Sequence, residues 1–330
     1  MRAPAFWAAE RGGVAAAALT PLSWLYRLGT RSHAALARPS RAARPVICVG
    51  NFTVGGAGKT PTVLALVALL AEEGVRPHVL TRGYGGSERG PLRVDPARHG
   101  ADAVGDEALL LARAAPTWLS RDRPSGAAAA ASGGADVLLM DDGMQTPGLA
   151  KDICIAVLDG GAGFGNGRLL PAGPLREPLA CGLNRAQALV LVGADRKGAL
   201  AALGSHDLPL IEASLLPGDE VRALRERPVV AFAGIGRPEK FFETLTESGC
   251  NVIARHAFAD HHRYKPGEIA AIVDQAKDRD AVTVTTEKDY VRLPPDARAA
   301  VRTLSVTLVW HDPAALRSLL APLVTRCRRG

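Results

Sequence analysis

Eight consecutive residues, 53 to 60, have the composition and spacing of a loop that binds nucleotide phosphates. They read TVGGAGKT, and the usual pattern is G-x-x-x-x-G-K-[ST]. Backbone N–H groups of such a loop point at phosphate oxygens, Lys59 would reach the β- and γ-phosphates, and the Thr60 hydroxyl would ligate Mg²⁺. The one departure is Thr53, where the pattern has glycine. We predict that this phosphate loop binds a nucleotide through Thr53, Val54, Gly55, Gly56, Ala57, Gly58, Lys59 and Thr60.

The competing interpretation of this stretch is a plain glycine-rich turn. Its surroundings favour the phosphate loop. The apolar run 45–49 precedes it and predicts a strand, and residues 62–73 follow as an apolar helix. Strand, glycine loop and helix is the required order. Pro61 suits the first helical turn, because its missing N–H would have no helical partner there.

Two adjacent carboxylates, Asp141 and Asp142, follow the apolar run 137–140. An acid at the end of such a strand is the arrangement that holds Mg²⁺ in many nucleotide-binding enzymes. Neighbouring side chains of an extended chain point to opposite sides, so one aspartate could face the metal while the other orients a loop. A surface strand end is the alternative, but the upstream phosphate loop favours a metal site.

A glycine- and proline-rich loop, residues 164–178, follows the apolar run 153–159. Loops of this length inside an enzyme usually belong to a site. Arg176 would neutralise phosphate charge, and Glu177 would hold Mg²⁺ or a hydroxyl group. Arg82, in TRGYGG at 81–86, could also meet a phosphate.

Two further stretches carry groups suited to proton transfer. Asp106 lies in GDEALLLA, 105–112, and is either a general base or a favourable first-turn charge of a helix. His261 and His262 lie in FADHHRY, 258–264, and fit acid–base work, metal binding or surface polarity. Two adjacent histidines without a third ligand do not predict a zinc site.

Charge and cysteine content narrow the class of partner. The formal net charge of +7 favours anionic partners such as phosphorylated substrates or acidic lipids. Nucleic acid is not expected, because no RNA- or DNA-binding motif is recognisable and aromatic residues are only 5% of the chain. The five cysteines lack C-x-x-C spacing, which is typical of a reducing compartment and argues against structural zinc.

Apolar runs alternate with helical stretches after residue 44, which predicts an α/β fold with a parallel sheet covered by helices on both faces. The length of 330 residues favours two domains. Residues 124–134 fit a helix end with a loop or a flexible insertion. We expect an N-terminal segment over 1–44, a phosphate-loop domain over 45–222, and a smaller α/β domain over 228–330 that closes over the site.

The N-terminal segment has an apolar stretch, residues 12–26, that is too short and too interrupted by Pro21 to span a membrane. A signal peptide is one alternative. Trp7, Trp24 and Tyr26 lie among arginines that include Arg11. Aromatic anchors beside cations suit an amphipathic helix in a membrane interface. A helix packed on the protein's own core is the other alternative. We expect membrane contact, because the positive charge agrees with it.

Together these motifs resemble the tetraacyldisaccharide 4'-kinases of lipid A biosynthesis. The resemblance extends over nearly the whole chain, through PLSWLY, GNFTVGGAGKTP, RGYGG, GDEA, DDGMQ, NGRLLPAGPLREP, FADHHRY and TTEKDYVRL. It implies transfer of the ATP γ-phosphate to the 4'-hydroxyl of an acylated glucosamine disaccharide 1-phosphate, giving lipid IVA. It also implies Mg²⁺ and peripheral association with the cytoplasmic face of the inner membrane.

The resemblance further implies roles for single residues. Asp106 matches the family's proposed general base and His261 its partner, while Lys59 and Arg176 supply positive charge. The residues implied at the metal are Thr60, Asp141, Asp142 and Glu177. Two positions depart from the family pattern: Ala108 stands where proline is usual, and Thr146 where histidine is usual.

Two other activities remain open on the residues alone: a kinase of a soluble sugar or nucleoside, and a regulatory NTPase. Val54 bears on the oligomeric state. Related loops spelled G-K-G-G-x-G-K-T carry at that position a lysine that reaches across a dimer interface. Because Val54 replaces it, we expect a monomer whose site is completed within one chain.

Overall fold

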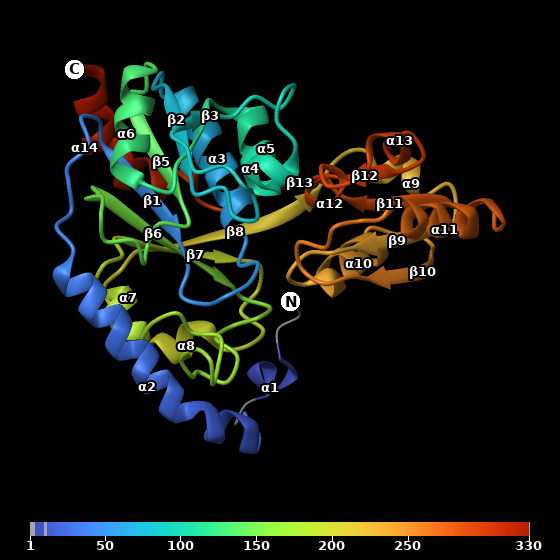
Figure 1. Ribbon diagram of the computed structural model, residues 1–330, viewed down its shortest axis with the longest axis horizontal. Coiled ribbons are helices and arrows are strands. Elements are labelled where there is room, and N and C mark those ends of the chain that lie inside the picture. The colour runs from blue at the N-terminus through green and yellow to red at the C-terminus, as the bar shows by residue number, and fades with distance from the viewer. Residues whose placement is uncertain (1–3, 10–11, 330) are drawn as a thin grey trace.

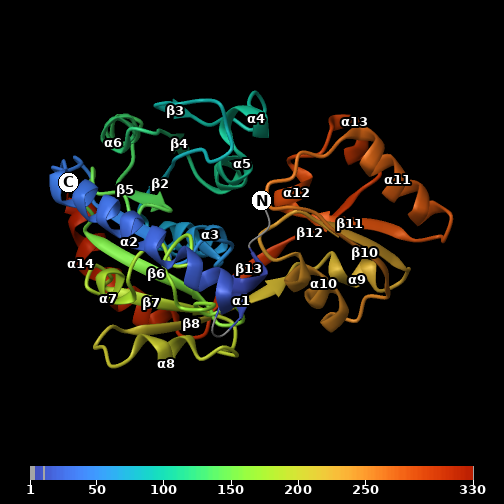
Figure 2. The same ribbon diagram turned by 60° about the horizontal axis from the view of Figure 1, so that its bottom comes forward.

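The computed structural model describes residues 4–9 and 12–329. Two helices precede the first strand: the short α1 (Ala5–Ala8) and the long α2 (Gly13–Leu36). The rest forms two sheets with their helices, which lie side by side (Figures 1 and 2).

The large sheet has nine strands in the order β13-β8-β7-β6-β1-β5-β2-β4-β3. Its interior neighbours are parallel, and only the edge pairs β13–β8 and β3–β4 are antiparallel. The predicted parallel α/β sheet is therefore confirmed, with antiparallel edges added. The strands are β1 (Val46–Gly50), β2 (Pro77–Thr81), β3 (Leu92–Arg93), β4 (Thr117–Leu119), β5 (Val137–Asp141), β6 (Ile153–Asp159), β7 (Ala188–Val192), β8 (Leu210–Pro217) and β13 (Val306–Trp310).

Helices cover both faces of the large sheet. Strand β1 shows why, because Ile47 and Val49 belong to one apolar cluster and Val46 and Cys48 to the other. A strand buried on both sides reads as a continuous apolar run. One face carries α3 (Lys59–Glu72), α5 (Asp106–Ala114) and α14 (Pro313–Arg329); the other carries α6 (Arg123–Ser132), α7 (Leu179–Leu183) and α8 (Ala199–Leu203). The ambiguous residues 124–134 thus lie mostly in a helix, α6.

The small sheet has four parallel strands in the order β10-β9-β11-β12. They are β9 (Val229–Ala233), β10 (Val252–Ala257), β11 (Val282–Thr286) and β12 (Arg302–Leu304). The helices of this part are α9 (Val221–Leu224), α10 (Pro238–Glu247), α11 (Pro266–Lys277), α12 (Glu287–Tyr290) and α13 (Pro295–Arg298). Short α4 (Ala101–Val104) precedes α5 in the large-sheet part.

The last elements of the chain differ from expectation. The sequence predicts that all residues over 228–330 belong to the smaller α/β domain, but Ser305 separates β12 from β13, and β13 pairs with β8 in the large sheet. Leu316 and Leu320 of α14 pack in the same apolar cluster as Leu66 of α3. An apolar run predicts a strand, but it does not indicate which sheet that strand will join. The chain therefore passes between the sheets twice, after β8 and before β13, and these two strands pair with each other.

Helix α2 is longer than the apolar stretch that predicted it, and its amphipathic character is present. It packs on the loop 164–178: Ser23 Oγ donates to the Leu169 carbonyl at 2.9 Å and Tyr26 Oη to the Arg176 carbonyl at 3.1 Å. Its other side leaves Trp24 67% exposed. Arg11 lies outside the described residues. No helix within 4–9 and 12–329 combines the length and the apolar character needed to cross a membrane.

Candidate active site

The phosphate loop joins the central strand β1 to α3, and its glycines are required by its backbone. Gly55 has φ of 115° and Gly58 of 88°, a region that side chains other than hydrogen strongly disfavour. Gly58 is the N-cap of α3 and, lacking a side chain, makes no capping hydrogen bond to the first N–H groups of that helix. Free N–H groups at a helix N-terminus suit an anion such as phosphate.

Thr53 replaces glycine because the chain is extended there. Thr53 forms an isolated antiparallel bridge with Leu175 and has no positive φ. On either side of it, Val54 N donates to the Pro174 carbonyl at 2.8 Å and Arg176 N to the Phe52 carbonyl at 2.8 Å. A β-branched residue suits extended backbone. The loop 164–178 therefore pairs with the start of the phosphate loop, a contact that sequence spacing did not predict.

A carboxylate faces the cations of the phosphate loop. Asp142 Oδ1 lies 2.7 Å from Arg176 Nη1 and 3.8 Å from Lys59 Nζ, and Asn51 Oδ1 accepts a hydrogen bond from Lys59 at 3.3 Å. Burial alone would raise the pKa of Asp142, but the charges of Lys59 and Arg176 bring it below its usual value. Asp142 has a left-handed φ of 49°, which is uncommon for aspartate and costly to hold.

Its neighbour Asp141, the last residue of β5, is buried. Its Oδ1 has no hydrogen-bond partner among the described residues. Burial, with the nearby charges of Glu107 and Asp142, raises the pKa of Asp141 to about 7. The buried Arg123 donates to the backbone carbonyl of Asp141 at 3.1 Å and not to its carboxylate. A buried carboxylate oxygen without a partner is expected where a cation binds.

Glu177 is engaged elsewhere. Its Oε1 accepts from Gln145 Nε2 at 2.8 Å, and its Oε2 pairs with Arg185. Over the described ranges, no group of three or more His, Cys, Asp or Glu side chains is arranged to hold a metal ion. Mg²⁺ needs no such group when it binds one or two carboxylates, substrate phosphates and water. The donor set of Thr60 and Asp141 fits that mode.

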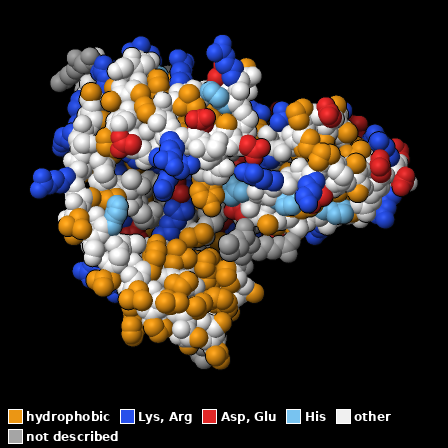
Figure 3. All heavy atoms as spheres, viewed as in Figure 1, with side chains coloured by type: hydrophobic (Ala, Val, Ile, Leu, Met, Phe, Trp, Pro, Cys, Tyr) orange, Lys and Arg blue, Asp and Glu red, His pale blue; other side chains and the backbone are white. Residues whose placement is uncertain are grey.

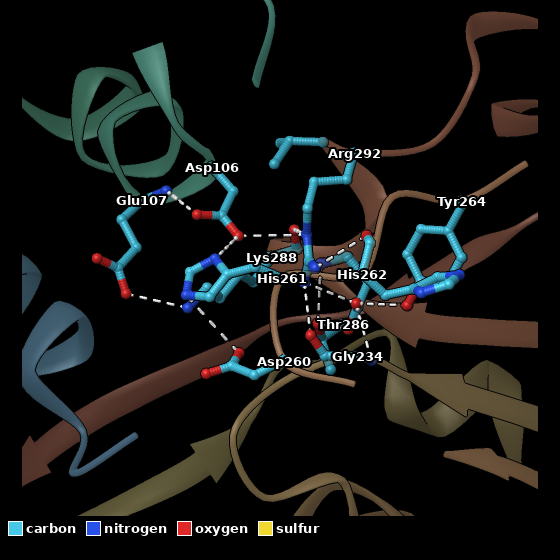
Figure 4. Close-up of polar contacts among 12 residues, drawn as sticks. Asp106, Glu107, Gly234, Asp260, His261, His262, Tyr264, Thr286, Lys288 and Arg292 are labelled. Carbon is cyan, nitrogen blue, oxygen red and sulfur yellow. Dashed lines mark hydrogen bonds and ion pairs between the residues drawn. The ribbon is translucent and has the colours of Figure 1, made fainter. Parts of the chain in front are cut away.

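The predicted base and its partner meet across the two sheets (Figure 4). His261 Nδ1 lies 3.0 Å from Asp106 Oδ2, and Arg292 Nε lies 3.2 Å from the same oxygen. Burial would raise the pKa of Asp106, but the hydrogen bond with His261 and the charges of Lys288 and Arg292 lower it below its usual value. His261 has a left-handed φ of 56°, a strained conformation that the structure maintains.

The neighbouring histidine is directed away from this pair. His262 Nε2 lies 3.0 Å from Glu268, and its ring stacks on Phe258 at 4.7 Å between centroids. The geometry therefore distinguishes the two adjacent histidines, which the residues alone left open. The ring of Tyr84 packs against that of His261, with 5.0 Å between the ring centroids.

Comparisons with known proteins identify the family of this chain. The family model described as tetraacyldisaccharide-1-P 4'-kinase matches residues 15–325. The chain belongs to this family. It is 53% identical to the tetraacyldisaccharide 4'-kinase of Rhodospirillum centenum, over 98% of this chain and 97% of the relative. It is 52% identical to that of Paramagnetospirillum magneticum, over 99% of this chain and 98% of the relative.

A solved structure of the family has the same fold. The crystal structure of LpxK from Aquifex aeolicus in complex with ATP superposes with a TM-score of 0.75 at 28% identity, covering 94% of this chain and 99% of that one. The resemblance stated from the motifs is therefore confirmed over the full length.

The two departures from the family pattern leave the paired groups in place. Ala108 follows Glu107 in α5 and is buried with Val291 of the small-sheet part in one apolar cluster. Thr146 lies in the turn after Asp142, where its N–H donates to the Gly143 carbonyl at 3.0 Å.

Sequence reasoning missed two cations of the site. Lys288 Nζ lies 3.0 Å from Glu107 Oε1, and Arg292, besides Asp106, pairs with Asp289 at 2.8 Å. Both cations lie in TTEKDYVRL, so the motif marked them, but nothing local indicates a partner on the other sheet. Arg82, which could have met a phosphate, is exposed and has no hydrogen bond or ion pair among the described residues.

Proposed function

We propose that this chain transfers the γ-phosphate of ATP to the 4'-hydroxyl of a tetraacylated glucosamine disaccharide 1-phosphate, giving lipid IVA in lipid A biosynthesis. The observation that carries the proposal is the Asp106–His261 pair, 3.0 Å apart, in a chain of the tetraacyldisaccharide 4'-kinase family that also has the phosphate loop. This is phosphoryl transfer with an alcohol as acceptor, and it needs positioning and charge neutralisation above all.

Asp106 is the base of this proposal. Its lowered pKa keeps the carboxylate ionised at neutral pH, so it can accept the proton of the sugar hydroxyl. His261 and Arg292 both contact Oδ2, while Oδ1 accepts the backbone N–H of Glu107 at 2.9 Å. These contacts fix the direction of the carboxylate and stabilise its charge.

Lys59 and Arg176 carry the positive charge of the phosphate site. Asp142 holds both, which keeps the two cations beside the loop. Thr60 and Asp141 would hold Mg²⁺, which when bound neutralises charge on the β- and γ-phosphates. We place Asp142 and Glu177 outside the direct ligands, because Arg176 and Arg185 already occupy them.

We infer peripheral binding at the cytoplasmic face of the inner membrane, where an acylated substrate resides. Exposed apolar side chains gather along α2, opposite its contacts with the loop 164–178 (Figure 3): Val14 is 87% exposed, Leu25 65% and Leu28 64%. Arg27 and Arg31 are exposed on the same helix. A helix of this kind lies in the headgroup layer without spanning it.

We also propose that one chain completes the site. Asp106 comes from the large-sheet part and His261, Lys288 and Arg292 from the small-sheet part of the same chain. The predicted closing domain over 228–330 then shortens to about the small sheet, since β13 and α14 belong to the large one. The strands β8 and β13 would act as the hinge. Activity that required nucleotide-dependent dimerisation would contradict this.

The deciding experiment is an assay of the full chain with labelled ATP, Mg²⁺ and the disaccharide 1-phosphate in mixed micelles. We expect a labelled bis-phosphorylated lipid from the wild type and, from Asp106→Asn, a rate lower by at least about 10²-fold. Folded protein that labels a soluble sugar or nucleoside instead would favour the kinase alternative. Hydrolysis of ATP with no phosphorylated product would favour the regulatory NTPase.

A further inference from the structure

A contact between the two sheets that the chemistry above does not use lies at the end of β6. Asp159 ends that strand and its side chain is only 4% exposed. Arg237 Nη1 lies 2.6 Å from Asp159 Oδ2, and Lys240 Nζ lies 3.8 Å from the same oxygen. Arg237 caps α10 and Lys240 lies in its first turn. Two cations of the small-sheet part therefore face one buried carboxylate of the large sheet.

Two glycine contacts place this cluster beside the phosphate loop. A Cβ on Gly236 would lie 3.0 Å from the backbone nitrogen of Gly56, so the small-sheet part packs on the loop itself. A Cβ on Gly58 would lie 3.4 Å from Cγ2 of Val192, and Val192 is the register partner of Asp159. Neighbours of Arg237 and of Asp159 thus both contact the loop.

The charges of the cluster suit an anionic ligand. A lone carboxylate beside a phosphate loop would repel a nucleotide, but the Arg237 and Lys240 cations together outweigh Asp159. The carboxylate is itself fixed, because its Oδ1 accepts the N–H of Gly161 at 2.9 Å. A guanidinium carries five N–H donors in a rigid plane, so Arg237 can pair with Asp159 and still donate to a phosphate.

We propose that Arg237 contacts the polyphosphate of ATP: its guanidinium pairs with Asp159 on one side, and phosphate oxygens accept hydrogen bonds from its remaining N–H groups. The inference rests on the proposed ATP-dependent activity and assigns it a further nucleotide-binding residue. Arginines supplied to a phosphate loop by a separate structural unit are a recurrent device of phosphoryl transfer. Here that unit is part of the same chain.

The alternative is that Arg237 and Asp159 form only a latch between the sheets. The two ideas differ in what happens when Asp159 loses its charge. A latch is broken equally from either partner, so Asp159→Asn and Arg237→Ala would act alike. If Arg237 contacts the nucleotide, Asp159→Asn leaves that cation in place and removes a negative charge near the phosphates.

The test is the dissociation constant of ATP, measured by calorimetry on the full chain with Mg²⁺. We expect Arg237→Ala to weaken ATP binding by about 10- to 100-fold, the usual effect of losing a hydrogen bond between charged groups. Asp159→Asn should bind ATP as tightly as wild type or more tightly, and Arg237→Lys should restore part of the affinity. Arg227→Ala, which removes an exposed arginine of the small-sheet part that pairs with Asp280, is the control and should change nothing.

Two results would overturn the inference: an Arg237→Ala constant within twofold of wild type, or equal weakening by Arg237→Ala and Asp159→Asn. Melting curves identify variants that do not fold. If Arg237→Ala is one of them, Arg237→Gln is compared with Arg237→Lys, and equal affinity of these two also overturns it. A wild-type chain that binds no ATP at all would instead count against the proposed function.

Discussion

On the large sheet, the phosphate loop is held by backbone hydrogen bonds and an apolar core, whereas the groups contributed by the small sheet are held by ion pairs. β1 and the loop 164–178 fix the start of the phosphate loop through main-chain contacts, and the first residues of α3 complete it. From the small-sheet part, His261, Lys288 and Arg292 contact Asp106 and Glu107 directly.

The difference indicates that one side of the site is preformed and the other is conditional. Backbone and apolar contacts depend little on salt or on a partner. Ion pairs between two units form only when the units dock, and those that are partly exposed weaken with salt. We expect the proton acceptor to be correctly placed only in the docked arrangement, which would limit wasteful transfer of phosphate to water.

The largest expected effect lies on the preformed side. Lys59→Ala should lower the rate of labelled transfer by at least about 10³-fold, because it removes a charge that stabilises the transferring phosphate. Lys277→Ala, which removes an exposed lysine paired with Asp274, is the control and should match wild type. A Lys59→Ala variant with substantial activity would remove Lys59 from the site.

On the conditional side, Asp106→Ala should lower kcat by about 10²- to 10⁴-fold, the usual contribution of general base catalysis. The KM for ATP should change little, because the phosphate loop is intact. Steady-state kinetics separate the two effects. The exposed Asp274, which pairs with Lys277 within α11, provides the control Asp274→Ala. An unchanged kcat would exclude Asp106 as the base.

The docking itself can be weakened at Lys288. Lys288→Met leaves Glu107 without its partner, and we expect a loss of about 1–3 kcal/mol in the free energy of unfolding. Glu107→Gln in the same chain should recover part of this loss, since no unpaired charge then remains. Chemical denaturation of the four forms of this double-mutant cycle measures the coupling. Losses that simply add would show that the pair contributes nothing.

A smaller effect, on membrane binding, is expected at helix α2, which belongs to neither side of the site. Leu25→Glu on α2 should weaken binding to vesicles of anionic lipid by about 5- to 30-fold, because it places a charge on the apolar stripe. ATP affinity should not change. Val309→Glu, at an exposed apolar position on β13, is the control. Equal vesicle binding by both variants would argue against α2 as the membrane contact.

For the coupling free energy between Glu107 and Lys288 we expect no change with pH near neutrality. Lys288 lowers the pKa of Glu107 below its ordinary 4.5. The stabilisation that the ionised Glu107 contributes is therefore full above pH 4.5, and it is lost only as the pH falls through the lowered pKa. Burial would lower the pKa of Lys288, but the charges of Glu107, Asp106 and Asp260 raise it above 10.5. The stabilisation that the charged Lys288 contributes is therefore lost only as the pH rises above 10.5. The coupling free energy should stay constant from about pH 5 to 10. A change within that window would show that other groups control the pair.

Much of the preformed side could be predicted from sequence, because its information is local. Strand, glycine loop and helix follow one another within about thirty residues, and Asp141 and Asp142 are marked by the apolar run before them. The parallel sheet follows from strands that are apolar on both faces.

The conditional side could not be predicted in the same way. Lys288 and Glu107 are separated by 181 residues, and no periodicity indicates that a cation on one sheet meets an acid on another. Periodicity also failed for β13, since it indicates the type of an element but not its neighbour. The sequence does not predict the left-handed backbone at His261, so it could not show that His261 and His262 have different partners.

The return of β13 and α14 to the large sheet has a consequence for how the protein is made. The ribosome releases these residues after the other strands of both sheets, yet their side chains fill the core beneath α3. During synthesis the four strands of the small sheet emerge before β13, so the large sheet must wait for β13 and α14 with one edge open. A nascent chain cut short after β12 would therefore retain a complete small sheet and an unfinished nucleotide site.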